Sequence, residues 1–93
     1  MTIDAIRECV LLAAKEFPVS RITLFGSRAA GTNREDSDVD LIVEFSAPVS
    51  LLTISALRYR LEDRLGIAVD IIHGPIQSED MIEIGKVVEL FAA

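Results

Sequence analysis

The apolar residues of this chain recur at helical spacing in some segments and as short continuous runs in others. Near the start, apolar residues three or four positions apart predict an amphipathic helix over about residues 3–16, which Pro18 ends. A second helix is predicted between a cap at Ser50 and Gly66, because serine favours helix starts and glycine favours helix ends. Its apolar face carries four residues at helical spacing, Ile54, Leu57, Leu61 and Leu65.

Short apolar runs that are rich in strand-forming residues predict three strands, over residues 22–25, 39–45 and 68–72. The segment 27–37 between the first two strands is small, polar and bounded by glycine, and it is predicted to be a loop with room for a short helix. Helices and strands in this order predict an α/β (α+β) class, in which helices pack on a small sheet.

The last segment fits two different structures. Ser78 is a candidate helix cap, and the apolar residues that follow keep helical spacing as far as Phe91, which predicts a final helix. The alternative is a helix that breaks at Gly85 and is followed by a strand over residues 86–91. The pattern alone leaves both structures open.

Composition and charge fit one folded, acidic domain. The chain has 93 residues, of which 51% are hydrophobic, so we expect a single domain over residues 1–93. Nine Lys and Arg against fifteen Asp and Glu give a net charge of −6, which disfavours autonomous binding to nucleic acid. No apolar run approaches the roughly 20 residues of a membrane span, and no signal-peptide pattern opens the chain. We therefore expect a cytoplasmic protein with no membrane association.

Two acids stand at the start of the second predicted strand. Asp38 and Asp40 are two positions apart, and side chains at this spacing point to the same face of a strand. Carboxylates this close repel each other unless a counter-charge lies nearby, and Mg²⁺, which prefers oxygen ligands, supplies one. The alternative is a pair of solvated carboxylates on an edge strand, but the apolar run that follows directly favours a metal site.

A third acid, Asp70, lies in the apolar run of the third predicted strand, where an unpaired buried carboxylate would be costly. Paired across the sheet with Asp38 and Asp40, it completes three acids around two metal ions. Two such ions can clamp the attacking and leaving oxygens of an in-line displacement. The alternative is an aspartate at a strand end that faces water.

A glycine-bounded loop precedes these acids. Gly26 and Gly31 permit positive φ and a close approach of the backbone to an oxyanion, and the Ser27 hydroxyl and exposed N–H groups suit phosphate oxygens. The alternative is an ordinary glycine-bounded turn. The glycine spacing also matches the first half of a P-loop, but Thr32 and Asn33 follow where a P-loop requires lysine, so we exclude that motif.

Taken together, GSRAAG over residues 26–31, SDVD over residues 37–40 and a later VD at residues 69–70 resemble the motifs of the polymerase-β-like nucleotidyltransferase superfamily. The chain is similar in length to its minimal (MNT) members, the antitoxins of HEPN/MNT toxin–antitoxin pairs. The resemblance covers nearly the whole chain and implies the superfamily's fold, a small mixed sheet packed with helices.

The resemblance implies a role for each acid. Asp38 and Asp40 would ligate both of two Mg²⁺ ions, while Asp70 would ligate the catalytic ion and assist deprotonation of the acceptor hydroxyl. These three aspartates are therefore the expected catalytic and metal-ligating residues, and ATP is the expected nucleotide donor.

The resemblance also implies a nucleotide-binding loop. Its expected residues are Gly26, Ser27, Arg28 and Gly31, of which the first two would hold the triphosphate. One departure stands out, because Ala30 occupies a position where minimal members often carry arginine. Arg28 or Arg34 would replace the lost phosphate contact, since arginine suits phosphate oxygens, or else these two residues are surface charges.

By the same resemblance we expect a metal-dependent nucleotidyltransferase that moves AMP from ATP to a tyrosine of a HEPN-type ribonuclease toxin and so acts as its antitoxin. A hetero-oligomer with the toxin or a homodimer is the expected assembly. The alternative function is an antitoxin that neutralises its toxin by binding, with weak catalysis or none. A structural domain without a site would require all three acid placements to be accidental.

Overall fold

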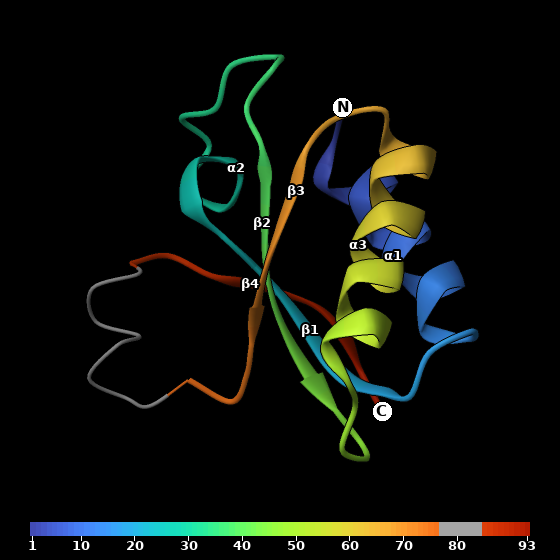
Figure 1. Cartoon of the computed structure of the whole chain (residues 1–93). Helices are drawn as coiled ribbons and strands as arrows, with labels where there is room; N and C mark the ends of the chain where they lie inside the picture. The colour runs from blue at the N-terminus through green and yellow to red at the C-terminus, as the bar shows by residue number, and fades with distance from the viewer. Residues whose placement is uncertain (77–84) are drawn as a thin grey trace.

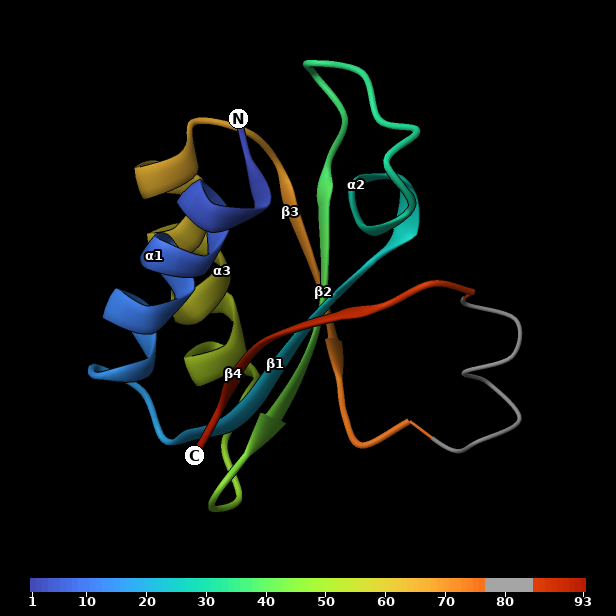
Figure 2. The same cartoon turned by 180° about the vertical axis from the view of Figure 1, so that it is seen from behind.

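The computed structural model describes residues 1–76 and 85–93. Its helices and strands are α1 (Ile3–Ala14), β1 (Val19–Phe25), α2 (Gly26–Ala30), β2 (Val39–Phe45), α3 (Leu51–Leu65), β3 (Val69–His73) and β4 (Val88–Ala92). Helices α1 and α3 cover one side of the sheet, and the short helix α2 lies on the other side (Figures 1 and 2).

The strands of the described residues form one sheet in the order β3-β2-β1-β4. Strand β1 runs antiparallel to both β2 and β4, whereas β3 runs parallel to β2. The sheet is therefore mixed, which confirms the predicted mixed α/β class. None of the helices in the described residues is long and apolar enough to cross a membrane.

The predicted caps of the second helix are confirmed. The Ser50 hydroxyl accepts a hydrogen bond from the backbone N–H of Thr53 at 3.3 Å, which satisfies a donor that the helix itself leaves free. At the other end, Gly66 takes the left-handed conformation, with a φ of 74°. Helix α3 therefore begins and ends where the sequence indicates.

Other element boundaries differ from the prediction. Helix α1 ends at Ala14, not at residue 16, β1 begins three residues early, at Val19, and β3 spans Val69–His73 instead of residues 68–72. The longer strand is explained by pairing, because Val19 lies opposite Phe45 at the end of β2. Strand β2 occupies the predicted residues 39–45, and the polar segment after β1 contains the short helix α2.

The prediction of a final helix reaching Phe91 is wrong, and the alternative of a strand after Gly85 is confirmed. Strand β4 pairs with the free edge of β1, which satisfies backbone groups that would otherwise remain unpaired. Its Leu90 is buried in the core. The predicted cap at Ser78 lies outside the described residues.

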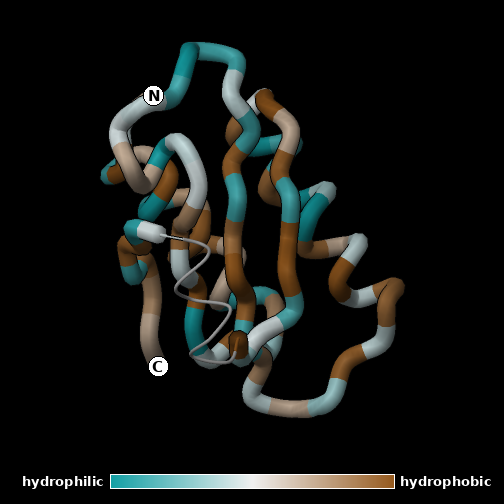
Figure 3. The backbone as a smooth tube through the Cα atoms, turned by 90° about the vertical axis from the view of Figure 1, so that its left-hand side faces the viewer, coloured by the Kyte–Doolittle hydropathy of each residue, from teal (hydrophilic) through white to brown (hydrophobic). Residues whose placement is uncertain are grey.

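The core lies between the sheet and the two long helices. Alternate residues of β2 are completely buried there, Val39, Leu41 and Val43. The residues between them point to the opposite side of the sheet, because side chains alternate along a strand. Figure 3 shows the hydrophobic stretches of the strands with hydrophilic positions between them. This opposite side, called the open face below, carries Arg21, Thr23, Asp40, Ile42, Glu44, Asp70 and Ile72.

Candidate functional site

The three predicted acids lie near one another at one end of the open face. Asp40 of β2 and Asp70 of β3 are directly paired in the parallel register of these two strands. Asp38 stands one residue before β2 begins, two positions from Asp40. Asp40 is half-buried, whereas Asp38 and Asp70 are exposed. The sheet therefore brings Asp70 beside two acids that lie 30 or more positions earlier in the sequence.

The pKa of Asp40 reflects its burial and the two neighbouring acids. It is raised above its ordinary value of 3.8, first by burial of the carboxyl, then by the charge of Asp70 and then by that of Asp38. An uncompensated cluster of carboxylates thus resists ionisation of its central member. A divalent cation would supply the missing positive charge, and carboxylate oxygens are ligands that Mg²⁺ prefers.

The three acids share one face of the sheet, but their side chains do not converge on one point. Within residues 1–76 and 85–93, no group of three or more His, Cys, Asp or Glu side chains is already arranged to hold a metal ion. The carboxylate chemistry of Asp38, Asp40 and Asp70 fits a divalent cation.

Gly26 brings the backbone of the β1–α2 turn directly against the central acid. Its φ is +74°, and a Cβ added to it would overlap Oδ2 of Asp40. The approach follows from the register, because Phe25, the last residue of β1, lies opposite Asp40. Only glycine leaves this space free. The glycine turn and the carboxylates therefore form one continuous site.

The rest of the predicted nucleotide loop forms α2 and its C-terminal end. Ser27 is half-buried in the first turn, and its carbonyl accepts the N–H of Thr32 at 3.0 Å. Gly31 ends the helix with a φ of 78° and has open space around it. Its requirement for glycine thus comes from backbone conformation and not from close packing, in contrast to Gly26. Ala30 and Arg34 are exposed.

Arg28 has a different environment from the one expected of a surface charge. It is only 4% exposed. Its Nε and Nη2 atoms donate to the carbonyl of Ser37 at 3.0 and 2.8 Å, and Nη2 also donates to the carbonyl of Glu35 at 3.1 Å. These bonds fix the end of the loop that leads into Asp38. The alternative that Arg28 is a surface charge is wrong, and its contact with a nucleotide stays a prediction.

Arg28→Met is expected to lower the free energy of unfolding by about 2–4 kcal/mol, because it removes three charge-assisted hydrogen bonds and leaves carbonyls without their donor. Arg28→Lys keeps the charge but loses the planar fork, so its loss should be intermediate. Urea denaturation measures both. Arg34→Met, an exposed change in the same loop, should alter stability by no more than about 0.5 kcal/mol. If Arg28→Met and Arg34→Met lowered the free energy of unfolding equally, the hydrogen bonds from Arg28 to Glu35 and Ser37, called the Arg28 clamp below, would have no importance for stability.

The fold and these residues agree with one family of enzymes. The nucleotidyltransferase domain family matches residues 6–90, and the chain belongs to it. Within this family, the chain is similar to the protein adenylyltransferase MntA of Thermococcus cleftensis, with 38% identity over 76 residues that cover 77% of each protein. This family membership confirms the resemblance that the glycine loop and the spaced acids indicated.

Solved structures give the same fold. A minimal nucleotidyltransferase superposes with a TM-score of 0.75 and 33% identity, over 95% of each chain. A chain from the complex of a tri-AMPylated Shewanella oneidensis HEPN toxin with its MNT antitoxin superposes with a TM-score of 0.71 and 16% identity, over 99% of this chain and 74% of the other. The second likeness is one of fold alone.

Proposed function

We propose that this protein transfers AMP from ATP to a tyrosine of a HEPN-type toxin, with Mg²⁺ as the required metal, and thereby acts as its antitoxin. The observation that carries the proposal is the contact between the Gly26 turn and Asp40, because it joins a phosphate-binding backbone to a cluster of metal-binding acids. The names of the relatives support the same reaction, since MntA of T. cleftensis is a protein adenylyltransferase.

In this reaction the Gly26–Ser27 turn holds the triphosphate, and Asp38, Asp40 and Asp70 hold two Mg²⁺ ions. The ions supply Lewis acidity and offset the charge that develops on the phosphoryl oxygens. The acceptor hydroxyl oxygen forms a bond to the α-phosphorus, and the bond from that phosphorus to the β-bridging oxygen breaks. Pyrophosphate leaves towards the glycine turn, and the hydroxyl proton passes to a carboxylate oxygen of Asp70.

The test is the intact mass of a co-purified HEPN-type toxin after incubation with this protein, ATP and Mg²⁺. We expect a mass gain of one or more AMP units, lost in Asp38→Asn because a metal ligand is gone. Asp36→Asn is the matched control, since Asp36 is an exposed acid in the same loop outside the three-acid set. It should transfer AMP as the wild type does. Unchanged transfer by Asp38→Asn would refute the assignment.

A second candidate function is supported by the arginines of the loop. Ala30 offers no guanidinium, and the Nε and Nη2 donors of Arg28 are already bonded to the backbone. This arrangement favours an antitoxin that neutralises its toxin mainly by binding. Under that function, the double variant Asp38→Asn/Asp40→Asn would protect cells as well as the wild type at equal complex formation. Under the catalytic function, it would bind the toxin but fail to protect.

A further inference from the structure

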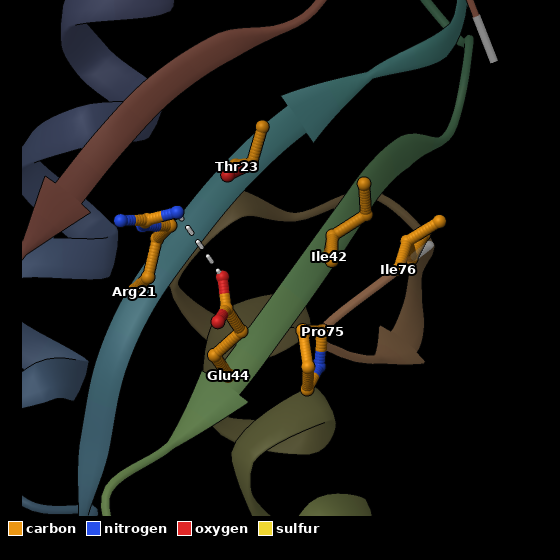
Figure 4. Close-up of a pocket in the computed structure, with 6 residues that line it drawn as sticks. All are labelled: Arg21, Thr23, Ile42, Glu44, Pro75 and Ile76. Atoms are coloured by element: carbon orange, nitrogen blue, oxygen red, sulfur yellow. Dashed lines mark ion pairs between the residues drawn. The ribbon is translucent and has the colours of Figure 1, made fainter. Parts of the chain in front are cut away.

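A hollow of about 230 Å³ lies on the open face next to the acids. Figure 4 shows the six residues that line it, with their side chains surrounding one space above the two central strands. They are Arg21 and Thr23 of β1, Ile42 and Glu44 of β2, and Pro75 and Ile76, which follow β3. None of them belongs to the catalytic or nucleotide-binding set named above.

One wall of the hollow depends on a close approach at Gly74. A Cβ added there would lie 2.9 Å from Cγ2 of Ile42 and 2.9 Å from Cγ of Glu44, so a larger residue would push the chain away from the sheet. The Gly74 N–H donates to the carbonyl of Val43 at 2.8 Å and holds the backbone in place. Gly74 thus carries the chain across β2, and Pro75 beyond it forms the wall.

The hollow begins one side chain away from the metal-binding acids. Ile42 is the next residue after Asp40 on the same face of β2, which places the two about 7 Å apart along the strand. Thr23 pairs with Ile42, just as Phe25 pairs with Asp40. A ribose attached to a phosphate held by the acids spans a comparable distance. The hollow therefore lies where the nucleoside of a bound nucleotide can reach.

The lining suits a flat, uncharged ring with polar edges. Ile42, Pro75 and Ile76 offer apolar surface, and the hydroxyl of Thr23 can donate or accept a hydrogen bond. The volume is below the range of about 300–1,000 Å³ that is typical of drug-sized ligands, so a single heterocycle fits and a whole nucleotide does not.

The charges around the hollow argue against a phosphate as its occupant. The guanidinium of Arg21 is already shared between the carboxylates of Glu44 at 3.6 Å and Glu89 at 3.3 Å. One cation against two anions leaves the local charge negative. Such a lining repels phosphate and suits the amino group of a base, which donates hydrogen bonds.

In the proposed reaction, the nucleobase of the donor nucleotide is the part that remains to occupy the hollow. In that reaction pyrophosphate departs towards the Gly26 turn, and an in-line acceptor approaches the α-phosphorus from the opposite side, with Asp70 as its base. The hollow lies over β1 and β2, and Pro75 and Ile76, which follow β3, form its wall. We infer that it binds the nucleobase of the nucleoside triphosphate, an inference that rests on the proposed function.

The experiment compares ATP with ribose 5-triphosphate, which lacks the base, by titration calorimetry in Mg²⁺. The wild type should bind ATP at least about tenfold more tightly, because only ATP fills the hollow. Ile42→Phe, which narrows the hollow, should remove this difference and leave the affinity for ribose 5-triphosphate unchanged. Ile72→Phe is the matched control, since Ile72 pairs with Ile42 in the neighbouring strand but lies outside the lining. It should behave as the wild type does.

The structure around residue 42 could rearrange to accept the larger ring in Ile42→Phe, so a second variant, Thr23→Val, is measured as well. Thermal melting confirms that each variant is folded. Thr23→Val keeps the shape but removes the hydroxyl, and it should change the ratio of affinities for ATP, GTP and CTP by about fivefold or more.

Two results would overturn the inference. One is that Ile42→Phe weakens the binding of ATP and of ribose 5-triphosphate equally, and the other is that Ile42→Phe and Ile72→Phe have equal effects on these affinities. A wild type that binds neither ligand in Mg²⁺ would refute the proposed function itself.

Discussion

Asp40→Asn is expected to lower the rate of AMP transfer by about 100- to 1,000-fold, while making the metal-free protein more stable at neutral pH. Activity falls because the amide cannot replace a carboxylate that binds the cations. Stability rises because Asp40 is half-buried and is repelled by Asp70 and Asp38. Single-turnover transfer with saturating ATP and Mg²⁺ measures the first effect, and urea denaturation in EDTA measures the second.

The pH dependence separates this gain in stability from a general effect of the substitution. The pKa of Asp40 is raised in the folded protein above its ordinary value of 3.8, so the folded state holds the proton more tightly than the unfolded chain does. The stability that this carboxyl contributes is therefore complete below about pH 3.8 and is lost as the pH rises through the raised pKa. Asparagine never ionises, so the variant should gain stability at neutral pH and lose that advantage in acid.

Mg²⁺ should reverse the order of stability. The cation binds the folded wild type and stabilises it in proportion to the logarithm of its concentration, whereas Asp40→Asn should respond weakly. Asp36→Asn serves as the control, because Asp36 is exposed and outside the cluster, and its response to Mg²⁺ should equal that of the wild type. A wild type whose melting temperature ignores Mg²⁺ would contradict the metal site.

Gly26→Ala is expected to cost about 2–4 kcal/mol of stability and to remove nearly all transfer activity. The new methyl group would occupy the space of Oδ2 of Asp40 and would sit on a residue with a φ of +74°. Either the carboxylate turns away from the metal position or the turn moves away from the triphosphate. Thermal melting and the rate of AMP transfer measure the two consequences.

Gly66→Ala isolates the contact from the backbone effect. Gly66 has the same φ of +74°, but a Cβ added there meets nothing within 4 Å. Its cost should be about 1 kcal/mol, from backbone conformation alone, and transfer should be unaffected. If Gly26→Ala and Gly66→Ala lose the same stability and both remain active, then the approach of Gly26 to Asp40 has no importance for the site.

The sequence predicts the central part of this fold well because the signals there are local. Strand β2 is a short run of strand-forming residues that follows a polar loop, so its bounds follow from composition, and the spacing of two between Asp38 and Asp40 predicts their common face. The caps of α3 follow in the same way from Ser50 and Gly66. The pairing of Asp70 with Asp40 is less local. The sequence predicts it from the cost of burying a lone carboxylate, but Asp70 is exposed, and its place beside Asp40 comes from the parallel register of β2 and β3.

Other features depend on neighbours that a pattern does not reveal. Residues 88–91 suit a helix or a strand, and the free edge of β1, more than 60 positions away, decides between them. The contacts of Arg28 were missed because an arginine in a glycine-rich loop suits a phosphate ligand and a backbone clamp equally well. The hollow was missed because its wall depends on the close approach of Gly74 to Ile42.

The Arg28 clamp has a consequence for how the loop can vary. Its acceptors are the carbonyl groups of Glu35 and Ser37, which every amino acid possesses. The side chain at residue 35 is therefore free to change without loss of those hydrogen bonds. The Ser37 hydroxyl is not, because it accepts the Arg34 N–H at 2.8 Å, and neither is the number of residues between Gly31 and Asp38. Loop libraries that randomise residues 32–36 at constant length should thus keep a folded site, and a single insertion should displace Asp38.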